Sequence, residues 1–128
     1  MQTVYKNLID HKSTYFTTAK YSGKDRIKKI LSEIWRYFPS STKFNPFKYI
    51  LIRILSGEEE VDPDEIKNIR SFFLEKNNDS HIMLGVEQDL SLKEKLKIQI
   101  CFTAFKINFA EVELKDLFES VPKKMIEK

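Results

Sequence analysis

The stretch HIMLGVEQDLSLKEKLKIQICFTAF, residues 81–105, carries the clearest strand signal in the chain. Apolar side chains occupy every second position from residue 96 to residue 104, opposite mostly polar ones. Alternation with a period of two is typical of a β-strand whose faces have different surroundings. A shorter alternation at residues 82–86 precedes it, and Asp89 lies in the turn between them, where Asp is a common turn residue. We therefore expect two strands joined as a hairpin.

Two further strands are expected upstream of this stretch. Residues 14–21, TYFTTAKY, are rich in the Thr, Tyr and Phe that strands favour. Residues 47–55, FKYILIRIL, are apolar on both faces, so we expect a central, buried strand. Depending on its register, its residues on the second face of the sheet are either Tyr49, Leu51 and Leu55 or Ile50, Ile52 and Ile54.

Amphipathic helices are expected after each of these two strands. The first follows Ser22, which forms a capping-box pattern with Asp25, and it ends at Pro39. The second begins at Asp62, with Pro63 in the first turn and acidic residues after it. The residues predicted to pack between helices and sheet are Ile27, Ile30, Leu31, Ile34, Ile66, Ile69, Phe73, Ile98, Ile100 and Phe102.

Shorter helical patterns lie at both ends, at residues 3–12 and 110–121. The second of these places Leu114, Leu117, Phe118 and Val121 on one face. The whole order predicts an α+β fold, with a four-stranded mixed sheet, two amphipathic helices on one face and a C-terminal helix. A chain of 128 residues fits one domain.

The composition excludes several classes of protein. A net charge of +3, from 22 basic and 19 acidic residues, is too balanced to indicate nucleic-acid binding. No apolar run approaches the roughly 18 residues of a membrane helix, and the first residues lack the plan of a signal peptide. The single cysteine, Cys101, cannot form an internal disulfide, which favours a reducing, cytoplasmic compartment.

A search for catalytic chemistry finds no motif. The three glycines are too scattered to cradle a phosphate. His11 and His81 lack a second ligand at metal spacing, and His81 is better interpreted as a surface or edge residue. Cys101, without a nearby histidine, is more typical of a buried structural thiol. The acidic run Glu58–Glu60 is best explained as a solvated loop before a helix N-terminus. We therefore expect no catalytic residue, cofactor or metal.

Four segments of the chain are SGKDRIKKIL, FKYILIRILSGEE, VDPDEIKNIRSFFLEK and DSHIMLGVEQDLSLKEKLKIQICFTAF. In order and spacing they resemble the C-terminal domain of FtsZ, the bacterial tubulin-like cell-division GTPase. The last is the most specific, and the residues in register with the family are Gly85, Asp89, Leu92 and Thr103–Phe105. Two departures are Ala104, where the family has Gly, and the missing second Gly after Gly57. The resemblance divides the chain into an N-terminal segment, 1–13, a core, 14–106, and a helical tail, 107–128.

The resemblance implies the fold and a surface for subunit contacts, but not the GTPase activity. FtsZ binds GTP with a separate N-terminal domain that carries a glycine-rich loop, and this chain shows no such loop. The last acidic residue that FtsZ sends into its neighbour's nucleotide would fall near Thr3. We therefore expect a freestanding, non-catalytic interaction module. Its partner would be a second copy, in a homo-oligomer, or another cytoskeletal or cell-division protein.

The residues expected to take part in protein contacts lie on the face of the sheet away from the two helices and on the tail. They are Leu51, Lys95, Lys97, Leu114, Leu117 and Phe118. In FtsZ-like proteins the helix that joins the two domains covers this face, and here Val4–His11, the tail or a second copy would replace it. The lysines, with Lys93, would meet an acidic partner or face solvent. Alternatively, the chain is a small-molecule-binding protein or enzyme with sites between subunits, or a fragment of a longer protein.

Overall fold

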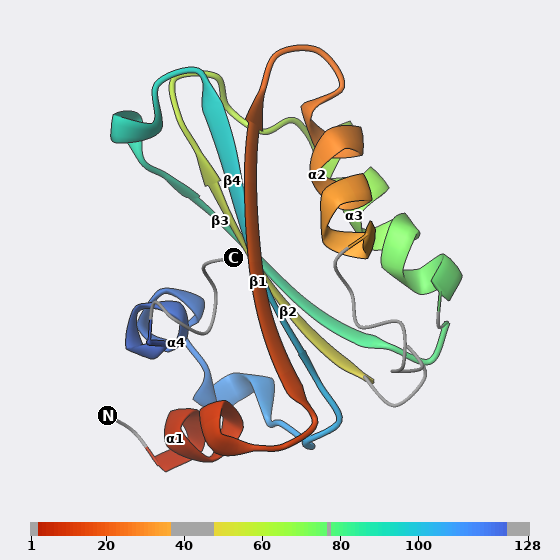
Figure 1. The fold of residues 1–128 in the computed structure, drawn as a ribbon, viewed down its shortest axis with the longest axis vertical. Helices are drawn as coiled ribbons and strands as arrows, with labels where there is room; N and C mark the ends of the chain where they lie inside the picture. The colour runs from red at the N-terminus through yellow and green to blue at the C-terminus, as the bar shows by residue number, and fades with distance from the viewer. Residues whose placement is uncertain (1–2, 37–47, 77, 123–128) are drawn as a thin grey trace.

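The computed structural model describes residues 3–36, 48–76 and 78–122. A four-stranded sheet in the order β1-β4-β2-β3 forms the middle layer, with helices on both faces (Figure 1). The strands are β1 (Thr14–Ser22), β2 (Tyr49–Ser56), β3 (His81–Gln88) and β4 (Lys95–Thr103). The helices are α1 (Thr3–Asp10), α2 (Arg26–Arg36), α3 (Pro63–Lys76) and α4 (Leu114–Ser120), with 3-10 helices η1 (Leu90–Leu92) and η2 (Phe109–Glu111). This arrangement confirms the predicted α+β fold with a mixed sheet.

The connection from β3 to β4 is not the hairpin that the sequence predicted. β4 pairs antiparallel with both β1 and β2, whereas β3 is an edge strand that runs parallel to β2. The connection passes over the end of β2, where the Asp89 amide donates to the Ser56 carbonyl oxygen and the Glu58 amide donates to that of Lys93, both at 2.7 Å. β4 takes the interior position because nearly all of its side chains are buried, on both faces.

One face of the sheet packs against α2 and α3. The register of β2 turns Ile50, Ile52 and Ile54 toward these helices, which decides between the two predicted alternatives. The buried residues of this first cluster are Ala19, Ile27, Ile30, Leu31, Ile34, Ile50, Ile52, Ile54, Ile69, Phe73, Leu96, Ile98, Ile100 and Phe102. They confirm the predicted core except for Ile66, which packs half-buried at its margin.

The two helices on this face begin in different ways. α3 has the predicted start, a capping box in which Asp62 Oδ1 accepts from the Glu65 amide at 2.8 Å and Glu65 Oε1 accepts from the Asp62 amide at 3.0 Å. The capping box predicted at Ser22 is wrong, because Ser22 still belongs to β1. The chain then passes through left-handed backbone at Gly23 and Asp25, with φ of 81° and 64°, before α2 can begin.

Three predicted positions lie outside the described residues. These are the helix end at Pro39, the strand start at Phe47 and the last part of the tail, residues 123–128. In the described part of the chain, β2 begins at Tyr49.

The other face of the sheet is covered by α1, η2 and α4 (Figure 1). The two ends of the chain are joined here, because the Tyr5 hydroxyl accepts from the Glu113 amide at 2.9 Å. A Cβ on Gly85 of β3 would lie 2.9 Å from Leu114 Cδ1, so the leucine side chain of α4 packs closely against β3 here. The buried residues of this second cluster are Tyr5, Leu8, Ile9, Phe16, Leu51, Cys101, Ile107, Val112, Leu114, Leu117, Phe118 and Val121. The terminal segments thus provide the cover that the sequence predicted, although the tail forms two short helices rather than one as far as residue 122.

We predict that Phe102→Ala lowers the free energy of unfolding by about 3–5 kcal/mol, the usual cost of truncating a buried aromatic residue. Phe102 is 1% exposed and its ring lies 5.6 Å from that of Phe73, so the truncation would leave a cavity between α3 and the sheet. Urea denaturation at neutral pH provides the measurement. The matched control is Leu90→Ala, since Leu90 is 61% exposed. A loss of about 1 kcal/mol or less for Phe102→Ala would contradict the face assignment.

Candidate functional site

The structure separates the six predicted contact residues into two groups. The apolar residues come together in the second cluster, where they are buried between the sheet and the terminal helices. These are Leu51 of β2 and Leu114, Leu117 and Phe118 of α4. Lys95 is exposed and Lys97 is half-buried, at the end of the same face that α4 does not reach. The apolar residues therefore hold the terminal helices against the sheet. Of the six predicted contact residues, only Lys95 and Lys97 are accessible to a partner.

A third lysine joins this pair across the strands. In the β1–β4 ladder Lys20 stands directly opposite Lys97, and Ser22 stands opposite Lys95. Directly opposed residues of an antiparallel pair point to the same face, with Cβ atoms about 5 Å apart. No ion pair to Lys20, Lys95 or Lys97 is present among the residues described. We call these three residues the lysine patch.

Beside the lysine patch, a buried arginine ties the sheet to α4. Arg53 of β2 is 7% exposed, and its Nε donates to Glu87 Oε2 at 2.7 Å. Its other nitrogens donate to Gln99 of β4 at 3.1 Å and to Glu119 of α4 at 3.4 Å. The guanidinium lowers the pKa of Glu87 below its usual value, chiefly through the hydrogen bond, and its own pKa is raised by the same bond. Arg53 thus links β2, β3, β4 and α4 through one charge.

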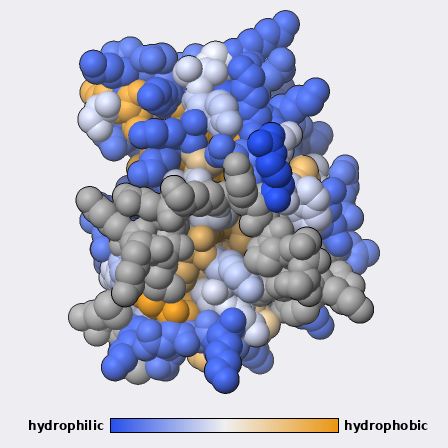
Figure 2. Space-filling model, viewed as in Figure 1, coloured by the Kyte–Doolittle hydropathy of each residue, from blue (hydrophilic) through white to orange (hydrophobic). Residues whose placement is uncertain are grey.

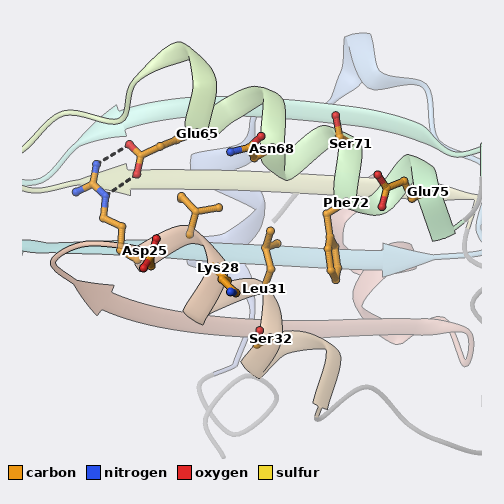
Figure 3. A pocket seen from close by; sticks show the side chains of 11 residues that line it. Asp25, Lys28, Leu31, Ser32, Glu65, Asn68, Ser71, Phe72 and Glu75 are labelled. Carbon is orange, nitrogen blue, oxygen red and sulfur yellow. Dashed lines mark hydrogen bonds and ion pairs between the residues drawn. The ribbon is translucent and has the colours of Figure 1, made fainter.

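A groove of about 470 Å³ runs between α2 and α3 (Figure 3). Leu31 and Phe72 contribute apolar surface to it. Polar residues from both helices and from the residue before α2 also line it, among them Asp25, Lys28, Ser32, Asn68, Ser71 and Glu75. Charges of both signs line the groove, so its electrostatics select neither an anionic nor a cationic ligand.

A second buried arginine closes one end of this groove. Arg26 is 3% exposed and makes a two-point contact with Glu65, with Nε to Oε2 at 2.8 Å and Nη2 to Oε1 at 2.9 Å. It also donates to the carbonyl oxygens of Glu59 and Glu60, at 3.3 and 3.1 Å. The hydrogen bond from Arg26 is the main cause that lowers the pKa of Glu65 below its usual value. One guanidinium therefore joins α2, the start of α3 and the acidic loop between β2 and α3.

The remaining polar candidates have structural surroundings. His81 is exposed at the start of β3 and stacks on Tyr49, with ring centroids 5.1 Å apart, which confirms the prediction of an edge residue. His11 Nδ1 accepts from the Ser13 amide at 3.1 Å. Cys101 is fully buried, and burial raises the pKa of its thiol, so it is not poised as a nucleophile.

Over the described ranges, no cluster of three His, Cys, Asp or Glu side chains could hold a metal ion. Within the same ranges, no helix is long and apolar enough to cross a membrane.

Both arginines were missed at the sequence level, although each had a signal. Arg53 is a charge inside the otherwise apolar run ILIRIL, and a charge in a strand with two buried faces requires a partner. Arg26 precedes Ile30 and Ile34 at helical spacing, on the buried stripe of its helix. Their carboxylate partners are 34 and 39 residues away in sequence, which local patterns do not reach.

Solved structures of tubulin-like proteins resemble this fold. An FtsZ dimer from M. jannaschii has a TM-score of 0.61 at 11% identity, covering 80% of this chain and 30% of that one. TubZ from Bacillus thuringiensis serovar israelensis, solved as GDP-form protofilaments, has a TM-score of 0.57 at 13% identity, covering 87% and 29%. A type III plasmid segregation TubZ scores 0.56 at 15% identity, covering 83% and 30%.

At these identities the likeness shows the tubulin-like fold alone, and the chain spans about 30% of the length of these structures. No protein-family model matches the sequence. No curated protein matches it significantly either.

We predict that Glu65 contributes to the acid sensitivity of the fold. Its folded-state pKa is lowered below the ordinary value of 4.5, so the stability it adds is present above that pH and is lost as the pH falls through the folded pKa. Glu65→Gln should therefore be less stable than the wild type at pH 7, and the difference should shrink below about pH 4.5. Urea denaturation across this range is the measurement, with Glu75→Gln, an exposed carboxylate on the same helix, as control. A difference that does not change with pH would exclude this role.

We predict that removal of residues 109–128 exposes the second cluster. The free energy of unfolding should fall by at least about 3 kcal/mol, because several apolar side chains lose their cover. The solution mass should rise through association of the bared face. Urea denaturation and light scattering measure the two effects. Phe118→Ala should reproduce part of the loss of stability, while Lys115→Ala, at an exposed site of α4, should not. A truncated protein that stays monomeric and equally stable would contradict the prediction.

Proposed function

We propose that this protein is a non-catalytic interaction module, equivalent to the C-terminal domain of FtsZ, which associates with copies of itself or with a tubulin-like polymer in the cytoplasm. The observation that carries the proposal is the likeness to chains whose structures were solved as a dimer and as protofilaments. The match covers most of this chain. The resemblance of the sequence to the FtsZ C-terminal domain points to the same part of that family.

The chemistry of the polar groups supports a non-catalytic role. Arg26 and Arg53 are enclosed and hydrogen-bonded to carboxylates that they hold in place. Arg26 borders the groove between α2 and α3, and its guanidinium is already bound there by both carboxylate oxygens of Glu65. Cys101 lies under the terminal cover with a raised pKa. These groups act to fix the positions of helices and loops, which is what a binding module requires.

The closure of both sheet faces supports association through outer surfaces. α2 and α3 fill one face, and α1, η2 and α4 fill the other. A partner then meets a preformed exterior, on which Lys95 and Lys97 are the accessible members of the predicted contact set. Leu51, Leu114, Leu117 and Phe118 support that exterior from inside.

Two measurements test the proposal. Equilibrium binding with labelled GTP should give no saturable signal at micromolar concentration. Light scattering over a range of protein concentrations should show self-association, or the protein should sediment with preassembled FtsZ or TubZ filaments. Saturable GTP binding would overturn the non-catalytic assignment. A protein that remains monomeric and sediments with neither filament would overturn the interaction role.

A further inference from the structure

The lysine patch is unfavourable for the isolated chain. Lys20 and Lys97 are directly opposed across β1 and β4, and like charges in that position destabilise a sheet. Lys95 is two residues along β4, on the same face, and adds a third positive charge. Asp89, at the start of the β3–β4 connection, has its pKa lowered chiefly by hydrogen bonds from Ser91, with a smaller contribution from the charge of Lys97. It forms no ion pair with the patch among the described residues. An anionic group placed against the patch would remove the repulsion.

The chain also carries an acidic loop that is held in a fixed shape. The side chains of Glu58, Glu59 and Glu60 are exposed, while Arg26 binds the carbonyl oxygens of Glu59 and Glu60. Arg26 also lies 4.0 Å from the Glu59 carboxylate. Glu58 and Glu60 have no ion-pair partner in the part of the chain that the structure describes. A loop whose backbone is already held avoids the entropy cost of ordering that backbone on binding.

The lysine patch and the acidic loop lie at the same end of the sheet. The Glu58 amide donates to the Lys93 carbonyl oxygen at 2.7 Å, which places the loop beside the start of β4. The upper end of the molecule in Figure 2 is mostly hydrophilic, with an apolar patch at its upper left. The loop is held by α2 on one face of this end and the lysines lie on the other face, so a single two-fold axis here would set the loop of each copy against the lysines of the other. One contact would then form two equivalent sets of ion pairs.

We propose that this protein self-associates through this end, with Glu58 and Glu60 of one copy against Lys20, Lys95 and Lys97 of a second copy. The inference rests on the proposed function in its self-association form. The occupant of the patch is a second copy because the complementary charges are present on the chain itself, in a fixed loop. Exposed ion pairs are individually weak, so the contact is reversible and depends on salt.

Analytical ultracentrifugation of charge-reversal variants tests the contact. At about 0.1 M salt, where the Debye length is about 10 Å, the wild type should self-associate, and at about 1 M salt it should dissociate. Lys95→Glu/Lys97→Glu and Glu58→Lys/Glu60→Lys should each weaken self-association at least about tenfold. An equimolar mixture of the two variants should associate again, because each supplies the charge that the other has reversed.

Controls separate this contact from folding and from net charge. Lys97→Glu removes the repulsion with Lys20, so the lysine variant should be at least as stable as the wild type in urea. Lys6→Glu/Lys12→Glu changes the net charge equally at exposed positions of the N-terminal segment and should not alter association.

The outcomes distinguish this inference from the proposed function. The inference would be overturned if the mixture of variants does not associate, or if neither charge reversal changes self-association. Self-association through another surface would still support the proposed function. A wild type that is monomeric at low salt would also overturn the inference. In that case sedimentation with filaments decides the function separately.

Discussion

The fold depends on the burial of two adjacent strands on both faces. β2 and β4 pair with each other in the middle of the sheet, and almost every side chain of both is enclosed. A strand of this kind cannot stay at an edge or face water, so β1 and β3 must flank the pair and apolar layers must cover both sides. The two amphipathic helices supply one layer, and the chain's ends supply the other. The β3–β4 connection crosses over the end of β2, so β4 pairs with β1 and β2 and β3 takes the edge position beside β2.

Two buried arginines, Arg26 and Arg53, lie where loops and helices meet the apolar core. A buried charge is costly unless its hydrogen bonds are satisfied, and a buried ion pair is not in itself a strong source of stability. Arg26 and Arg53 are both satisfied by two-point contacts with a glutamate. What each arginine provides is a fixed position: Arg26 sets the acidic loop and the start of α3 against α2, and Arg53 sets α4 and β3 against the centre of the sheet. The acidic loop is located mainly in this way, whereas α4 is also held by its buried Leu114, Leu117 and Phe118.

The sequence predicted those features that local patterns encode. The strands, the helix start at Asp62, the core face of β4 and the terminal cover all follow from periodicity and capping residues. The sheet order did not follow, because a short connection favours a hairpin and only the burial of both faces of β4 argues for an interior place. The start of α2 was missed because left-handed backbone at Asp25 is not visible in a pattern that otherwise matches a capping box. The lysine patch needed the β1–β4 register, since Lys20 is distant from Lys97 in sequence and meets it only through pairing.

The terminal cover determines which forces remain available for binding. The apolar strip on the second face, centred on Leu51 and Phe118, is occupied by the chain itself, so a hydrophobic contact there would first have to displace α4 and break the bond between Arg53 and Glu119. At the end of the same face, Lys20 and Lys95 are exposed and Lys97 is half-buried, which concentrates positive charge there. Contacts made there gain speed and selectivity from electrostatic complementarity more than raw affinity. Under the proposed function, both faces of the sheet stay enclosed whether or not a partner is bound. Association is then controlled by the charged end that carries the lysine patch and the acidic loop. Assembly and disassembly can then follow concentration and ionic conditions without unfolding any part of the domain.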